Sequence, residues 1–115
     1  MTYDFEADEK AVYDMLMNII NNGIPNIYNN ATDFVEQNLE DINDIWSPYY
    51  ARRKVNRIHF QNEVKRAYNH AEQYRLALES EDEKEVELRR GFIQRYKAQI
   101  AYSIKDGFSA GDPLP

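Results

Sequence analysis

The chain contains no cysteine, only four glycines and four prolines, and no long apolar segment. Without cysteine, a disulfide framework, a thiolate metal site and a cysteine nucleophile are all excluded. The scattered glycines form no phosphate-cradling loop. No apolar run approaches the roughly 20 residues of a membrane span, and the N-terminus is acidic where a signal peptide is basic. We therefore expect a soluble, cytoplasmic protein that makes no use of a membrane.

Residues suited to catalysis are also scarce. His59 and His70 are the only histidines, and on a helix they would stand about 16 Å apart, too far to share one ion. His59 and Glu63 could supply two ligands of a metal site, although such a pair is more often a polar flank of a helix. Glu36 and Glu40 share a helical face but have no histidine nearby, as a di-iron site would need. We therefore expect no enzyme activity, no cofactor and no bound metal.

Two long helices are predicted in the second half of the chain, at residues 48–78 and 81–106. Ser47-Pro48 opens the first, because proline is tolerated at the first helical position. Ser80–Glu83 has the pattern of a capping box, and Asp106-Gly107 offers a left-handed stop. So short a connection requires an antiparallel hairpin with facing apolar seams. The seam residues are Phe60, Val64, Ala67, Ala71, Tyr74 and Leu78 on the first helix, and Val86, Ile93, Tyr96, Ile100 and Ile104 on the second.

The first half of the chain predicts two shorter helices, at residues 4–21 and 32–46, each with one apolar stripe. The second must end before Pro48, which would remove a helical hydrogen bond. Asp41 and Asp44 then lie near its C-terminal end, where the helix dipole disfavours acids. We therefore expect these two carboxylates to meet a cation.

These patterns together predict an all-α fold: a single four-helix domain over residues 1–106, built on the long antiparallel hairpin. Residues 107–115 are predicted as an extended C-terminal tail containing two glycines and two prolines. Phe108 and Leu114 are its only sizeable apolar residues. The tail could be held by its own helices, by another copy or by a partner, and we expect these two residues to anchor it on another copy or a partner.

The net charge of −6 conceals an asymmetry along the chain. Residues 1–47 carry −9, whereas residues 48–78 carry +5. Either the acidic elements pack beside the basic helix and the charges cancel internally, or the two face different directions and steer a partner. The basic run Arg52–Arg57, with Tyr49 and Tyr50 beside it, could also neutralise phosphates and stack on bases. The low overall pI of about 4.9 disfavours that use.

Apolar residues are present in excess of what the hairpin seam needs. Leu88, Phe92 and Tyr102 project away from the second seam, and Ile58 and Leu76 are displaced from the first, as is Val55. Either the first two helices cover them, or they form a contact surface rich in aromatic rings. The candidate partner-binding residues are Arg52, Arg53, Lys54, Arg57, Tyr49, Tyr50, Leu88, Phe92, Tyr102, Phe108 and Leu114.

We expect a small, acidic, non-enzymatic helical protein that works by protein–protein contacts, with a protein partner or with itself. The first hypothesis is a subunit of a larger assembly. The cysteine-free, Asn-, Tyr- and Asp-rich composition suggests a phage-encoded protein on composition alone, and hence a virion. The second is a viral inhibitor of host defence that docks on a host nucleic-acid enzyme, by acidic mimicry of DNA. The third is nucleic-acid binding through the Arg52–Arg57 patch.

Overall fold

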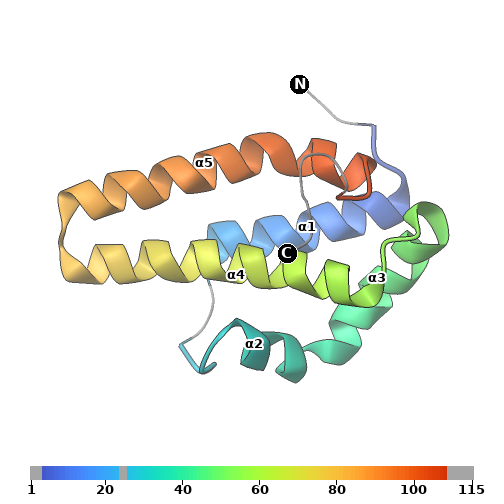
Figure 1. Cartoon of the computed structure of the whole chain (residues 1–115), viewed down its shortest axis with the longest axis horizontal. Helices are drawn as coiled ribbons and strands as arrows, with labels where there is room; N and C mark the ends of the chain where they lie inside the picture. The colour runs from blue at the N-terminus through green and yellow to red at the C-terminus, as the bar shows by residue number, and fades with distance from the viewer. Residues whose placement is uncertain (1–3, 24–25, 109–115) are drawn as a thin grey trace.

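The computed structural model describes residues 4–23 and 26–108, and helices account for 83% of them. No strand occurs in these two ranges, which confirms the all-α prediction. The structure divides them into five helices where the sequence predicted four (Figure 1). Their bounds are α1 Ala7–Asn22, α2 Ala31–Gln37, α3 Leu39–Arg53, α4 Arg57–Ser80 and α5 Glu83–Lys105.

Helices α4 and α5 form an antiparallel hairpin joined by Glu81 and Asp82 (Figure 1). The predicted seam is buried over most of its length: Phe60, Val64, Ala67 and Ala71 on α4, and Ile93, Tyr96, Ile100 and Ile104 on α5. The prediction fails at the closed end, where Leu78 is 50% exposed. Figure 1 shows that this end of the hairpin extends beyond α1, so no further helix covers it there.

Pro48 lies inside α3, and the prediction that it separates two helices is wrong. Proline removes one amide donor, but Ser47 and Pro48 are both exposed on the outer side of the helix. Water can therefore hydrogen-bond to the carbonyl that the missing amide leaves free. The next residue, Tyr49, is fully buried, and its packing favours continuation of the helix through the proline.

The true breaks occur at Asn38 and between Lys54 and Asn56. Lys54 takes a left-handed conformation with φ of 59°, and its amide donates to the Tyr50 carbonyl, which ends α3. The Asn56 side chain then accepts from the His59 amide at 2.7 Å and begins α4. The hairpin prediction of residues 48–78 is thus corrected to α4 alone.

The predicted Ser80–Glu83 capping box is also corrected. Asp82 is the N-cap of α5, and its carboxylate accepts from the Lys84 and Glu85 amides at 3.1 and 3.3 Å. Glu81 is left-handed with φ of 60°. The Ser80 hydroxyl instead donates to the Ala77 carbonyl at 2.8 Å, which closes the end of α4.

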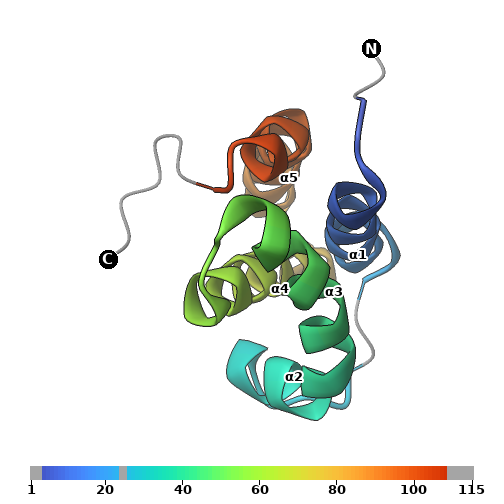
Figure 2. The ribbon, with the colours of Figure 1, turned by 90° about the vertical axis from the view of Figure 1, so that its right-hand side faces the viewer.

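Helix α4 is the centre of the fold, because it contacts each of the other four helices. Helix α1 packs beside both arms of the hairpin, and α2 lies against α4 away from α5 (Figure 2). The apolar stripe of α1 supplies Val12, Leu16, Ile19 and Ile20 to the core. The hairpin is therefore covered on one side by α1 and on another by α2 and α3.

The chain turns back after α5 and buries Phe108. Gly107 adopts φ of +66°, as the predicted left-handed stop required, and the Phe108 amide donates to the Ser103 carbonyl at 2.7 Å. The Phe108 ring is 2% exposed and meets the rings of Tyr49 and Phe60. Phe108 is thus a core residue, which corrects its assignment to a partner-binding tail. Leu114, its companion in that prediction, lies outside the described residues.

Candidate protein-contact site

The basic end of α3 is paired with the acidic start of α1. Arg52 Nε lies 3.0 Å from Asp8 Oδ1, and its Nη2 is 3.8 Å from Glu6 Oε2. The Arg53 Nη2 atom lies 2.7 Å from Glu9 Oε2. These bases stand in the last turn of α3 and the acids in the first turn of α1, so both helix dipoles favour the arrangement. The charges of Arg52 and Arg53 are thus balanced by acids of the same chain, as in the alternative in which the charges cancel internally.

Glu9 is the most enclosed of these charges, with 0% of its surface exposed. Lys105 Nζ lies 3.3 Å from Glu9 Oε1, and the Glu6 amide donates to the same oxygen at 2.9 Å. Burial raises the pKa of Glu9, but hydrogen bonds from the Glu6 amide, Arg53 and Lys105 outweigh it and lower the net pKa below 4.5. The carboxylate therefore joins α1, α3 and α5 as an anion.

The expectation for Asp41 and Asp44 is corrected by the break at Asn38. Because α3 begins at Leu39, Asp41 stands in its first turn, where the dipole favours an acid. Both aspartates are exposed to solvent. Arg52 and Arg53, basic residues that follow them in the chain, pair with α1 instead.

The remaining residues of the predicted basic and aromatic surface are dispersed. Tyr49 is fully buried, and its hydroxyl donates to the Ile104 carbonyl at 2.6 Å, so it cannot bind a partner. Lys54 Nζ lies 5.3 Å from the centre of the exposed Tyr50 ring. Arg57 is the first residue of α4, three residues after Lys54 in the chain. The structure therefore does not bring Arg52, Arg53, Arg57 and Tyr49 together on one open face.

Apolar side chains outside the seam are only partly covered by other helices. Val55 is buried, as in the first alternative, but Ile58 is 70% exposed and Leu76, Leu88 and Tyr102 are also exposed. Phe92 is half-buried between Arg89 and Arg95, whose guanidinium carbons lie 5.7 and 5.0 Å from its ring centre. These residues are spread along the hairpin and do not form one patch.

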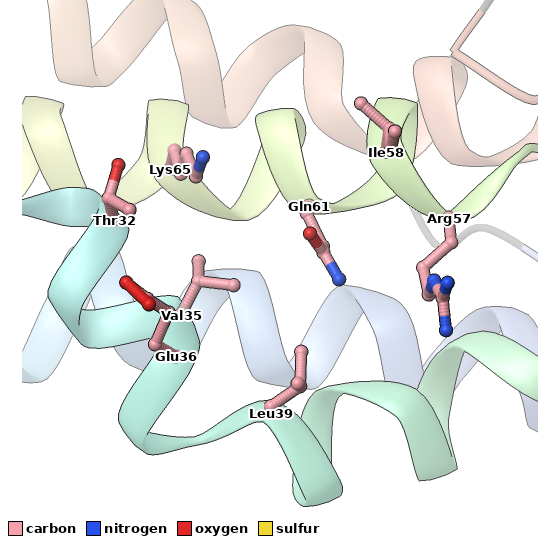
Figure 3. A pocket seen from close by; sticks show the side chains of 8 residues that line it. All are labelled: Thr32, Val35, Glu36, Leu39, Arg57, Ile58, Gln61 and Lys65. Carbon is pink, nitrogen blue, oxygen red and sulfur yellow. The ribbon is translucent and has the colours of Figure 1, made fainter.

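Ile58 borders a groove of about 340 Å³ between α2 and α4 (Figure 3). Figure 3 shows Val35 and Leu39 pointing toward α4, with Gln61 of α4 reaching toward them. Leu39, the first residue of α3, is 39% exposed. The lining residues are Thr32, Val35, Glu36, Leu39, Arg57, Ile58, Gln61 and Lys65. The groove thus has an apolar strip open to solvent.

Charges of opposite sign border the two sides of this groove. Arg57 and Lys65 lie on the α4 side, and neither meets a carboxylate within the part of the chain that the structure describes. Glu36 lies on the α2 side, and the exposed Glu40 and Asp41 follow it in the first turn of α3. The groove is therefore basic on one side, acidic on the other and apolar between them.

Sequence reasoning identified Arg57 and Ile58 but missed the partners from α2 and α3. Glu36 and Leu39 were placed on a single helix over residues 32–46, whereas the structure breaks the chain at Asn38. The available signal was Asn38 itself, whose side chain donates to the Phe34 carbonyl at 2.8 Å. Asparagine commonly competes with helical hydrogen bonds in this way.

The candidate metal pair is placed in the core. His59 Nε2 lies 3.9 Å from Glu63 Oε2, both residues are buried, and Glu63 Oε1 is 3.8 Å from Arg66 Nη1. Among residues 4–23 and 26–108, no three His, Asp or Glu side chains group closely enough to hold a metal ion. None of the helices in these ranges has the length and apolar character needed to cross a membrane.

Comparison of the chain with protein-family models, with curated proteins and with solved structures finds no match.

Proposed function

We propose that this protein is a non-enzymatic assembly subunit that works by protein–protein contacts, and that its first contact is with a second copy of itself through the α2/α4 groove. The observation that carries the proposal is Ile58. It exposes 70% of its surface beside a groove that also exposes Leu39. Exposed apolar side chains that border a groove commonly mark a contact site.

The charges beside the groove favour a second copy as the occupant. A two-fold axis through the groove lays the α4 edge of one copy against the α2/α3 edge of the other. Arg57 and Lys65 of each copy then face Glu36 and Glu40 of its neighbour, while Ile58 and Leu39 cover one another. Such a self-complementary contact closes as a dimer, whereas head-to-tail contacts extend into rings or filaments. The dimer is the unit from which a larger assembly would be built.

The other hypotheses depend on charged residues that form ion pairs within the chain. Arg52 and Arg53 are paired with Asp8 and Glu9, which weakens the case for nucleic-acid binding through Arg52–Arg57. The same pairs largely bury Asp8 and Glu9, which removes these two carboxylates from any acidic surface that could imitate DNA. Ile58 and its groove are untouched by these pairings, which leaves protein contact as the best-supported function.

The proposal is tested by the mass of the full chain in light scattering over a range of concentrations. The parent chain should show a concentration-dependent dimer, and Ile58→Glu should make it monomeric by burying a charge at the centre of the contact. Leu76→Glu is the matched control, since Leu76 is also exposed but lies near the tip of the hairpin. Its mass should follow that of the parent.

Charge exchange provides the second arm. Lys65→Glu should weaken the dimer by placing like charges opposite one another, and the double variant Lys65→Glu/Glu36→Lys should restore it. A parent chain that remains monomeric at about 1 mM would contradict the proposal and favour the inhibitor hypothesis. Equal loss of mass in the Ile58 and Leu76 variants would contradict the choice of groove.

A further inference from the structure

A second hollow, of about 250 Å³, lies between α4 and α5 and is separate from the α2/α4 groove. Helix α4 contributes Arg66 and His70, and α5 contributes Phe92, Arg95, Tyr96 and Gln99. Among the residues that the structure describes, no carboxylate lines it. In a chain with a net charge of −6, a hollow lined by two arginines is a local concentration of positive charge.

Arg66 and Arg95, the two arginines of the hollow, are less closely paired with carboxylates than other arginines of α4 and α5. Arg89 Nε donates to Glu85 at 2.7 Å, and Arg75 Nε to Glu72 at 2.9 Å. Arg95 has no carboxylate partner within the described ranges and instead stands over the Phe92 ring. In the described part of the chain, the carboxylate nearest to Arg66 is that of Glu63, at 3.8 Å, beyond hydrogen-bond distance. Arg66 and Arg95 therefore retain donors for an oxyanion, which guanidinium groups bind through paired N–H groups.

Tyr96 supplies an independent sign of a ligand. It is 7% exposed, and its buried hydroxyl has no hydrogen-bond partner among the residues that the structure describes. A buried hydroxyl left without a partner destabilises the folded state, and a ligand oxygen brought within its reach would satisfy it. Burial raises the pKa of Tyr96, with Glu63 adding to the effect and Arg66 opposing it. The hydroxyl therefore stays protonated and can donate.

His70 is placed to respond to an anion. Its ring centre lies 5.4 Å from that of Tyr96. Burial lowers its pKa below 6.5, and the positive charges of Arg66 and Arg89 lower it further. A bound dianion would offset these charges, as well as that of Arg95, and raise the pKa again. The imidazole is thus a reporter inside the hollow.

We propose that this hollow binds a small organic phosphate, with the phosphate on Arg66 and Arg95 and an aromatic group against Phe92 and Tyr96. Gln99 adds an amide donor on the same side. The volume is below the range of about 300–1,000 Å³ usual for drug-sized ligands, so the part of the ligand inside the hollow is about a phosphate and one ring. The site is independent of the dimer contact.

Phenyl phosphate is the probe, titrated into the full chain at constant ionic strength so that screening does not change. The His70 ring signals in proton NMR should shift during the titration, and the His70 pKa should rise at saturation. Inorganic phosphate should shift the same signals with an affinity several-fold weaker, because it cannot contact the rings. Absence of any His70 shift at about 20 mM phenyl phosphate would overturn the proposal.

Arg95→Gln should weaken phenyl phosphate binding by about tenfold or more. Arg57→Gln is the matched control, because it removes the same charge from an arginine that borders the other groove. Tyr96→Phe, which keeps the ring and removes only the hydroxyl, should weaken binding by a smaller factor. Equal weakening by the Arg95 and Arg57 variants would overturn the site, because it would show general attraction to the protein surface. Tighter binding of a phosphotyrosine peptide than of phenyl phosphate would overturn the choice of a small molecule.

Discussion

Glu9 and Arg53 join the first helix to the third through a 2.7 Å ion pair in which the carboxylate is wholly buried. The arginine is one third exposed, as is Lys105 on the other side of the carboxylate. The pair therefore sits where the core meets solvent. The Glu9 carboxylate is shielded from water, whereas Arg53 and Lys105 remain partly hydrated.

Glu9→Gln should destabilise the protein by about 1–3 kcal/mol in urea unfolding. Removal of one partner from a buried pair usually costs about 3–5 kcal/mol, and the partial exposure of Arg53 and Lys105 reduces that cost. Asp14→Asn is the matched control, since Asp14 pairs with Lys10 on the exposed face of the same helix. A change below about 0.5 kcal/mol is expected there. Equal effects of the two variants would show that the Glu9 contacts contribute nothing beyond surface charge.

The same carboxylate should make stability depend on pH. Its pKa is lower in the folded chain than in the unfolded chain, so the unfolded state binds the proton first as the pH falls. The stabilisation from Glu9 is present above the ordinary pKa of 4.5 and is lost as the pH falls through the lower, folded value. Urea midpoints measured from pH 7 to pH 3 should therefore fall less steeply in Glu9→Gln than in the parent. Parallel curves would contradict the assignment.

Phe108→Ala should destabilise the protein by about 3–5 kcal/mol, the range for removing a buried aromatic ring. The ring packs between Tyr49 and Phe60, so the surrounding core cannot easily close the space. Tyr102→Ala, in the last turn of α5 just before Phe108 but 61% exposed, is the control and should change stability by less than about 0.5 kcal/mol. Thermal unfolding by circular dichroism measures both variants. If Phe108→Ala were as stable as its control, the placement of Phe108 in the core would be contradicted.

The contribution of the seam residues to stability should decrease toward the closed end of the hairpin. Phe60→Ala should cost about 3–5 kcal/mol, because Phe60 is 1% exposed. Leu78→Ala, on the same predicted stripe, should cost less than about 1 kcal/mol because the side chain is half exposed. Urea unfolding of both variants tests the boundary. A large loss at Leu78 would indicate that something covers the tip in solution.

Pro48→Ala should stabilise the protein by about 2 kcal/mol. Proline inside a helix is disfavoured by about 3 kcal/mol relative to alanine, but the extra freedom of the unfolded alanine chain offsets part of that difference. Ser47→Ala is a control on the same exposed turn. A loss of stability at position 48 alone would indicate that the proline rigidifies the entry to the Tyr49 packing.

The sequence predicts the helical class, the antiparallel hairpin and most of its seam, because these follow from a strong 3.6-residue repeat and a short turn. It misplaces the boundaries around Asn38 and Pro48. At both points a local preference competes with packing that only the folded chain contains. The burial of Tyr49 extends α3 beyond Pro48, and the Asn38 side chain ends α2 although the apolar stripe continues.

The candidate contact site was only partly accessible from the sequence for the same reason. Arg52 and Arg53 were identified as a basic surface, but their acidic partners lie 44 residues earlier in the chain. No local sequence pattern indicates which residues so far apart in the chain will pair. The groove likewise joins α2 to α4 across a break that the apolar repeat does not reveal, so Ile58 could be identified as displaced from the seam but its neighbours could not.

The position of Glu9 constrains the order in which the chain can fold during synthesis. Its partner Lys105 lies 96 residues further along, and Lys105 also donates to the Asp4 carbonyl at 2.7 Å. The start of α1 can pair with Arg52 and Arg53 earlier, but it cannot complete its native contacts until the last helix has left the ribosome. Contacts of such long sequence separation slow folding and leave early segments exposed meanwhile. The acidic residues at the start of α1 keep the nascent segment charged, and so less prone to aggregate, until α5 arrives.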